Sequence, residues 1–386
     1  MVVYLDIALV TETFEPFKGG SAKRYLEVFK RLSKKGFNID VYTVRLKPSW
    51  LIHEEIEGLN VYRTETVLRN FITGDGFRSV REVLIYTYWV YKSLRDKDYD
   101  LIEANHCPIF PTFPSKLYSI FKNVPLSITF HEVWYDHWYR YVPNKVYAPL
   151  GIILEKTMSK LPDAYISVSE YTSSRLINLL KIDADKVYTI PNGVDLNLYE
   201  SIDVDRDSTR IIYLGRLNPH KRLEDLLNAM KIVVKRYSDV RLDVVGDGPM
   251  RRVYESYVNS NGLKKHVVFY GSLSDAEVVR MLKSSYVYVL PSIREGQSIT
   301  TLEAMAAGTP QIIVNSDGSG ARYLIEEAGS GFTVDPSPYS IAEAIMRILD
   351  DRSLWLKFHR NSISYVRYYT WDRAAEEHYK LYRNLA

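Results

Sequence analysis

Short apolar, β-branched segments alternate with amphipathic helical segments along almost the whole chain. The pattern begins with an apolar segment at residues 3–10 and an amphipathic segment at residues 22–35. Such alternation is typical of parallel β-sheets whose strands are joined by helices. In open sheets of this kind, ligands bind beyond the carboxyl ends of the strands. Candidate functional residues are therefore expected directly after the predicted strands.

The alternation falls into two blocks, as a chain of 386 residues allows. Residues 199–210 separate the blocks, carry alternating charge and lack apolar periodicity, so they predict a solvated linker. We predict an α/β protein with two Rossmann-like, doubly wound parallel-sheet domains, 1–198 and 208–366, facing a central cleft. A helix at 371–386 is expected to dock back on the first domain. The expected strands are 3–10, 39–44, 101–104, 126–130, 164–168 and 187–190, then 211–214, 242–245, 267–270, 287–290 and 311–314.

Charge and composition exclude several classes of protein. The chain has 50 Lys and Arg against 47 Asp and Glu, which disfavours electrostatic binding of nucleic acid. A single cysteine, Cys107, cannot form an internal disulfide, and neither a secretion signal nor a membrane-spanning run is evident. We expect a cytoplasmic protein. The scarcity of glutamine is typical of heat-adapted proteins.

Residues 291–310, PSIREGQSITTLEAMAAGTP, contain the most informative motif. They follow an apolar strand and predict a loop, a helix capped by Ser298 or a following threonine, and a helix end at Gly308. Backbone N–H groups near Ser298 and Ile299 would then face the cleft. The start of a helix attracts anions, so the segment predicts a phosphate site.

Glu295 and Glu303 lie on the loop and on the helix of this segment. The second is about five residues into the helix, or roughly 8 Å along its axis. A nucleoside diphosphate sugar has groups in a matching order: a ribose diol for Glu303, a diphosphate for the helix start and sugar hydroxyls for Glu295. Alternatively, each carboxylate is an ordinary solvated or helical residue.

The segment resembles the Glu-x7-Glu signature of retaining family 4 glycosyltransferases, which have the GT-B fold and use nucleotide sugars. Gln297 and Ser298 depart from the common form, which leaves the donor sugar open. The resemblance implies that Gly296, Gln297, Ser298 and Ile299 bind the donor. The matching residues are Glu295, Leu302, Glu303, Ala304, Met305, Ala306, Gly308 and Pro310.

Two further segments of the second domain resemble the same family. Residues 213–223, YLGRLNPHKRL, are similar to a loop in which an arginine and a lysine hold the donor diphosphate, here Arg216 and Lys221. A guanidinium and an ammonium group would stabilise charge on the leaving nucleotide. Residues 270–273, ending at Leu273, are similar to a turn near the nucleotide base. The glycine turn 246–248 is interpreted as structural.

The first domain has three candidate segments. Gly19 and Gly20 open a helix, as does the family's glycine loop facing donor and acceptor, although a turn without a ligand explains them equally well. His131 follows a strand and resembles a sugar-contacting histidine of the family, against the alternative of a structural histidine. The aromatic and basic residues 134–147 suit an acceptor platform, a membrane-interface anchor or packing onto their own domain.

The resemblance implies a retaining glycosyltransferase with Glu295, Arg216, Lys221 and His131 as catalytic residues. Neither a cofactor nor a metal is expected. The expected partners are a nucleotide-sugar donor and a glycan, lipid-linked or small-molecule acceptor, with peripheral contact to the inner membrane face left open. Two alternatives are a nucleotide-sugar epimerase of the same fold and a noncatalytic sugar-nucleotide-binding protein.

Overall fold

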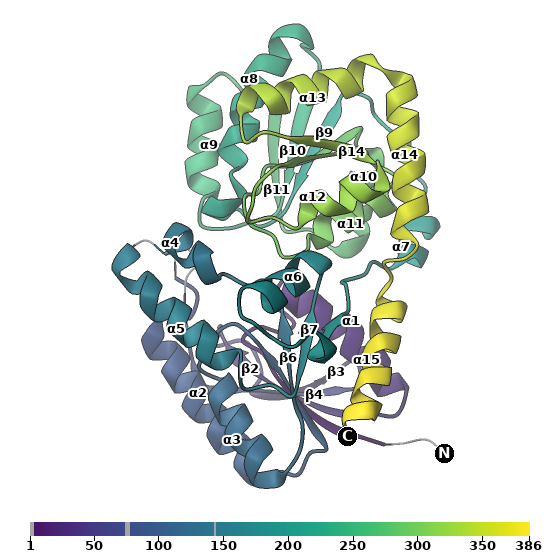
Figure 1. Cartoon of the computed structure of the whole chain (residues 1–386). Helices are drawn as coiled ribbons and strands as arrows, with labels where there is room; N and C mark the ends of the chain where they lie inside the picture. Colours follow the sequence, from purple (N-terminus) through teal and green to yellow (C-terminus); the bar gives the residue numbers. More distant parts are fainter. Residues whose placement is uncertain (1–3, 74–77, 143) are drawn as a thin grey trace. The chain divides into compact units, whose positions relative to one another are not determined.

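The computed structural model describes residues 4–73, 78–142 and 144–386 (Figure 1). It divides these residues into two compact units. The first unit extends to Asn192 and also includes Trp371–Ala386, and the second is Gly193–Thr370. Each unit has its own buried apolar core.

The first unit contains an eight-stranded sheet in the order β3-β4-β2-β1-β5-β6-β7-β8. The strand pairs are parallel except for the antiparallel hairpin β3–β4. This hairpin was not predicted because its residues are largely charged or polar; its two-residue turn, Glu57-Gly58, has positive φ at both positions. The strands are β1 (Asp6–Val10), β2 (Asn38–Arg45), β3 (His53–Ile56), β4 (Leu59–Val67), β5 (Leu101–Asn105), β6 (Leu126–Phe130), β7 (Ala164–Ser167) and β8 (Val187–Thr189). Residue 3, the first of the predicted strand 3–10, lies outside the described residues.

Helices connect these strands. Right-handed connections place α1, which leads from β1 to β2, on the opposite face of the sheet from α3 and α5, which lead from β5 through β6 to β7. The C-terminal helix α15 packs against α1 within this unit, where the Phe37 and Tyr379 rings stack at 5.2 Å. The helices are α1 (Gly20–Lys34), α2 (Val80–Arg95), α3 (Thr112–Lys122), α4 (Trp138–Tyr141), α5 (Ala148–Met158), α6 (Glu170–Asn178) and α15 (Trp371–Leu385), with 3-10 turns η1 (Tyr135–His137), η2 (Lys145–Tyr147) and η3 (Ala184–Lys186).

The second unit contains a six-stranded parallel sheet in the order β11-β10-β9-β12-β13-β14. The predicted fold class, two parallel-sheet α/β domains, is thus confirmed; strand β14 was not predicted. The strands are β9 (Arg210–Leu214), β10 (Arg241–Val245), β11 (Val267–Gly271), β12 (Val287–Leu290), β13 (Gln311–Val314) and β14 (Gly331–Val334). The helices are α7 (Leu196–Ser201), α8 (Leu223–Arg236), α9 (Arg251–Ser260), α10 (Asp275–Ser284), α11 (Ile299–Ala306), α12 (Ala321–Ala328), α13 (Pro338–Asp350) and α14 (Arg352–Val366), with the 3-10 turn η4 (Pro219–Lys221).

Each sheet has one point at which the order of its strands reverses. In the second unit the chain builds β9, β10 and β11 in one direction and then places β12 on the other side of β9. In the first unit the reversal lies between β1 and β5. Loops that leave the two strands at such a point diverge and create the usual ligand site of an open α/β sheet.

The predicted linker at 199–210 is wrong, because this segment packs into the second unit. Tyr199 of α7 is 6% exposed and belongs to the core of that unit. Arg206 donates hydrogen bonds to the carbonyls of Ser285 (2.6 Å) and Ala307 (2.7 Å). These contacts are mostly polar, which explains why the segment lacks apolar periodicity.

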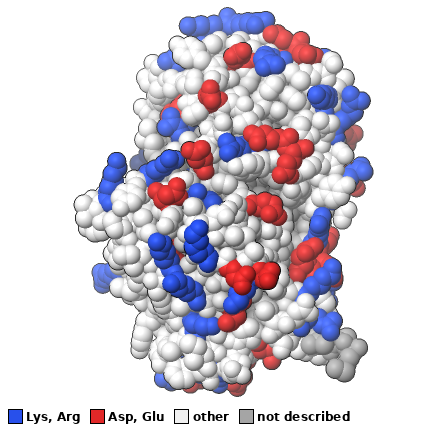
Figure 2. Space-filling model, viewed as in Figure 1, with Lys and Arg blue, Asp and Glu red and all other residues white. Residues whose placement is uncertain are grey.

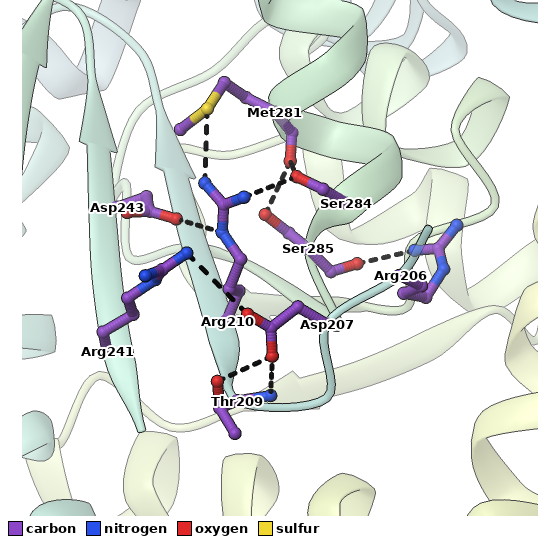
Figure 3. A network of polar contacts seen from close by, with 9 residues as sticks. All are labelled: Arg206, Asp207, Thr209, Arg210, Arg241, Asp243, Met281, Ser284 and Ser285. Carbon is purple, nitrogen blue, oxygen red and sulfur yellow. Dashed lines mark hydrogen bonds and ion pairs between the residues drawn. The ribbon is translucent and has the colours of Figure 1, made fainter. Parts of the chain in front are cut away.

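A polar network continues from this segment into the sheet (Figure 3). Arg210 at the start of β9 donates from Nε to Oδ2 of Asp243 at 2.7 Å and from Nη1 to Oγ of Ser284 at 2.9 Å. The Asp243 side chain is fully buried. The network lies at the amino-terminal ends of β9 and β10, at the opposite end of these strands from the loops described below.

Within the described part of the chain, none of the helices is both long and apolar enough to cross a bilayer.

Candidate functional site

The loops after β9 and β12 meet at the reversal point of the second sheet. Nζ of Lys221 lies 2.5 Å from Oε1 of Glu295, and these side chains are only 16% and 10% exposed. The backbone joins the same loops, since the Ile293 N–H donates to the His220 carbonyl at 3.1 Å. The structure thus brings together two predicted site residues that are 74 positions apart in the sequence.

Three cations gather around His220 in these loops. The pKa of His220 falls to about 2 because burial disfavours the charged ring and because Arg294, Lys221 and Arg216 repel its proton. Arg294 and His220 were not predicted as site residues. Their sequence signal was weak: each merely adjoins a predicted residue, Glu295 or Lys221. The cluster produces a positive potential, partly offset by Glu295, that suits a multiply charged anion.

The neighbouring turn after β10 supports the loop that carries Arg216. The N–H of Leu217 donates to the Asp247 carbonyl at 3.0 Å. A Cβ added at Gly246, where φ is +125°, would lie 2.0 Å from the Gly215 carbonyl oxygen. Only glycine permits this approach. The turn therefore has a structural role, as the sequence predicted.

The loop that carries Glu295 is held by the segment after β13. The Glu295 N–H donates to the Gly318 carbonyl at 3.1 Å, and the Glu295 carbonyl accepts from the Gly320 N–H at 2.7 Å. Both main-chain groups of Glu295 are therefore fixed. This restricts the directions in which its carboxylate can point.

Helix α11 begins and ends as predicted. Ser298 is the N-cap, and its Oγ accepts from the Thr301 N–H at 3.2 Å. Gly308, with φ +63°, follows the C-terminal end. The N–H groups before Thr301 have no acceptor within the helix, as at any helix start. Gly296, Gln297, Ser298 and Ile299 are all buried.

Glu303 and Leu273 have different surroundings from Glu295. The Glu303 side chain lies on α11 and is 6% exposed. Burial raises the pKa of Tyr199 well above its usual value, and the nearby Glu303 carboxylate raises it further. Leu273, after β11, is partly buried against the core. Glu303 therefore combines a carboxylate with a sheltered position, and its contact with a ribose stays a prediction.

In the first unit, His131 follows β6 and packs edge-on against the Tyr25 ring, with ring centroids 5.7 Å apart. Its pKa lies well below the usual value because burial disfavours the charged ring, and His106 and Arg24 add repulsion. Its Nε2 is buried without a hydrogen-bond partner among the described residues. The ring is therefore neutral and retains hydrogen-bonding capacity.

The glycine loop of the first unit has a steric explanation. Gly19 is the N-cap of α1, which begins at Gly20, and its backbone is extended with φ −169°. A Cβ at Gly19 would lie 2.8 Å from Cε1 of Phe17. Crowding against Phe17 favours glycine here without any ligand, so contact of Gly19 and Gly20 with a substrate stays a prediction.

The reversal point of the first sheet carries residues that were not predicted. Glu12, after β1, is 4% exposed and accepts from Nε of Arg78 at 2.6 Å. His106, after β5, accepts the His131 N–H at its Nδ1 at 3.3 Å. Their positions follow from the strand order, which the sequence did not reveal. They place charge and hydrogen-bonding groups beside His131.

The aromatic segment 134–147 divides into two parts. Glu155 of α5 accepts the backbone N–H of Trp134 at 2.8 Å and the indole N–H of Trp138 at 2.8 Å, so the first part packs onto its own unit. Tyr139, Val146 and Tyr147 are exposed. Residue 143 of this segment lies outside the described residues.

Across residues 4–73, 78–142 and 144–386, no three His, Cys, Asp or Glu side chains are grouped so that they could hold an ion. Independence from metal stays a prediction.

Comparisons with known proteins now identify the family. Family models match residues 18–198 (Glycosyltransferase Family 4) and 198–366 (Glycosyl transferases group 1). An uncharacterized glycosyltransferase of Methanocaldococcus jannaschii is 28% identical over 98% of each chain. The UDP-Gal:alpha-D-GlcNAc-diphosphoundecaprenol alpha-1,3-galactosyltransferase of Escherichia coli is 26% identical over 88% of this chain and 87% of its own.

The fold has a close counterpart among solved structures. Sucrose-phosphate synthase from Thermosynechococcus elongatus matches with a TM-score of 0.84 and 22% identity over 99% of both chains. The relatives are glycosyltransferases, so the epimerase alternative is not favoured. The chain belongs to the group 1, family 4 glycosyltransferases and has the GT-B fold.

Proposed function

We propose that this glycosyltransferase moves a sugar from a nucleoside diphosphate sugar to an acceptor hydroxyl with retention of anomeric configuration. One observation carries the proposal: the loops after β9 and β12 meet at the reversal point of the second sheet, where Lys221 pairs with Glu295 and where Arg216 and Arg294 also lie near His220. Three cations in partly buried loops suit a diphosphate better than a neutral ligand. The start of α11 offers further backbone donors for the same group.

The donor would occupy this cluster with its diphosphate. Oε1 of Glu295 accepts a hydrogen bond from Lys221, and the other carboxylate oxygen would accept hydrogen bonds from sugar hydroxyls. Glu303 would bind the ribose diol. Gly296, Gln297, Ser298 and Ile299 would line the sugar and diphosphate, with Leu273 near the base. A uridine nucleotide is the first choice to test, because the Escherichia coli relative is named for a UDP-galactose donor.

Catalysis would depend on stabilising the leaving diphosphate. As the bond from the sugar to the diphosphate breaks, negative charge grows on the leaving oxygen, and Arg216 and Lys221 are placed to offset it. In a same-face reaction the diphosphate itself takes the acceptor proton, so no carboxylate nucleophile is required. His131, neutral and with an unpartnered Nε2, would bind a sugar hydroxyl. We propose no metal or other cofactor.

The acceptor would be a hydroxyl of a glycan or of a lipid-linked saccharide. The support is the name of the Escherichia coli relative, which specifies a diphosphoundecaprenol-linked acceptor.

A thermal-shift screen with UDP, GDP and ADP tests the donor site, because a ligand that binds only the native state raises its stability. We expect one nucleotide to stabilise the wild type and Arg252→Ala, an exposed control on α9, but not Arg216→Ala. Donor hydrolysis by Arg216→Ala should fall about 100- to 1,000-fold. Equal responses of the two variants would refute the assigned site.

Product NMR tests the reaction. We expect transfer with the donor's anomeric configuration in the product. Inversion would refute the retaining mechanism, and conversion of the donor sugar to an epimer without acceptor would support the epimerase alternative instead.

A further inference from the structure

One side of the first unit exposes an unusual number of apolar side chains. Of the 24 large apolar side chains exposed in the described chain, 13 lie on α2, on α3 or between residues 139 and 153. We call these 13 the apolar face. Its members include Tyr88 (69% exposed), Phe121 (78%) and Val146 (78%). So dense a cluster is more than the scattered apolar residues of an ordinary surface.

Helical periodicity explains how α2 contributes to both the core and the apolar face. Val83, Tyr86 and Val90 point into the core of the first unit. Leu84 and Tyr88, four residues apart, are exposed on another side of the same helix. The helix is therefore apolar on its outer side as well, although water would favour polar residues there.

The helices that carry the apolar face belong to one layer. α2 packs against α3, and the right-handed connections place α3 and α5 on the same face of the sheet, opposite α1. In Figure 1, α2, α3, α4 and α5 lie together on one side of the first unit, and α1 and α15 lie on the other. The exposed apolar residues are therefore carried by one layer of helices.

Basic residues accompany the apolar face. Its segments, residues 80–95, 112–122 and 138–158, contain eight Lys or Arg and two acidic residues, Glu82 and Glu155. Glu155 is buried. Lys116, Lys122 and Arg95 form surface ion pairs with Asp163, Asp98 and Asp96. Arg81 and Lys92 are exposed on α2, and Arg140, Lys145 and Lys156 are exposed along 138–158. Lys and Arg side chains are visible over this part of the molecule in Figure 2.

We infer that the apolar face is a docking surface for an anionic lipid bilayer. Tyrosines and aliphatic side chains would enter the headgroup region, and the exposed lysines and arginines would contact lipid phosphates. The charge complementarity favours this partner over a second copy of the chain, whose identical face would bring like charges together. The inference adds to the proposed lipid-linked acceptor, but its test needs neither donor nor acceptor.

Vesicle sedimentation of the full chain tests the inference. We expect binding to vesicles of phosphatidylglycerol mixed equally with phosphatidylcholine, and weaker binding to phosphatidylcholine alone. Binding to the anionic vesicles should weaken as the salt concentration rises, because salt screens the attraction between exposed charges. Tyr88→Ser with Ile153→Ser should weaken binding about tenfold. The matched control, Tyr339→Ser with Val253→Ser on the second unit, has similar exposed area and should bind as the wild type does.

Lys92→Glu with Lys145→Glu should weaken binding to the anionic vesicles at least about tenfold and leave binding to phosphatidylcholine unchanged. Tm measured without ligand should be equal in the wild type and all these variants, which verifies their folding and keeps this test independent of the donor site. Equal binding of the apolar-face and control variants, or no vesicle binding by the wild type, would overturn the inference. So would a dimer in light scattering that Tyr88→Ser with Ile153→Ser dissociates.

Discussion

The ion pair between Lys221 and Glu295 allows a sharp test of how the site binds an anion. Its N–O separation is 2.5 Å, and both side chains are mostly buried. At an effective dielectric constant of about 20, Coulomb's law gives an attraction of about 6 to 7 kcal/mol before desolvation. Desolvation offsets much of this attraction, so the net value of the pair is far smaller.

Lys221→Met should weaken UDP binding for two reasons. It removes one cation from the diphosphate site, and it leaves the Glu295 carboxylate without its partner, so that this carboxylate repels the ligand. We expect a loss of about 100-fold, or about 2.7 kcal/mol. Adding Glu295→Gln removes the repulsion, so the double variant should bind UDP about tenfold more tightly than Lys221→Met alone.

Isothermal titration calorimetry with UDP on the wild type, both single variants and the double variant would measure this coupling as a double-mutant cycle. Glu295→Gln alone should bind UDP at least as tightly as the wild type, because it leaves the three cations in place. If the double variant binds no better than Lys221→Met, then Lys221 does not neutralise Glu295 and the electrostatic reasoning is wrong.

Two further predictions concern stability. Asp243→Ala should lower the free energy of unfolding by about 3 kcal/mol in denaturant titration, because it leaves the mostly buried Arg210 guanidinium without its carboxylate partner. Asp350→Ala, which breaks an exposed pair, should cost about 1 kcal/mol or less, and equal losses would contradict this assignment. Burial, and then repulsion by Arg24, lower the pKa of His378 to about 3 in the folded protein. Between pH 6.5 and 3 the unfolded protein therefore binds more protons at this residue than the folded protein does, so stability falls as pH falls. At about pH 5 the loss is about 2 kcal/mol. Tm measured against pH should therefore decline less steeply for His378→Gln than for the wild type, and parallel curves would refute the role of His378.

Much of the fold could be predicted because its signals are local. The expected strands coincide with strands of the structure, apart from small differences at their ends, since buried parallel strands are continuous apolar runs. The charged hairpin β3–β4 and the half-exposed strand β14 lack that pattern and were missed. The segment at 199–210 was misinterpreted for a related reason: polar contacts hold much of it in place, and periodicity detects only apolar packing.

The sequence alone determined which residues form the buried apolar strands, where α11 begins and ends, and which charged residues follow those strands. These properties depend on a few consecutive residues: a hydroxyl at Ser298 accepts an N–H three residues later, and Gly308 adopts a positive φ. Tertiary structure alone decided which loops meet. Lys221 reaches Glu295, and Arg294 joins them, because β9 lies beside β12 in the sheet, and strand order is set by packing of the whole unit.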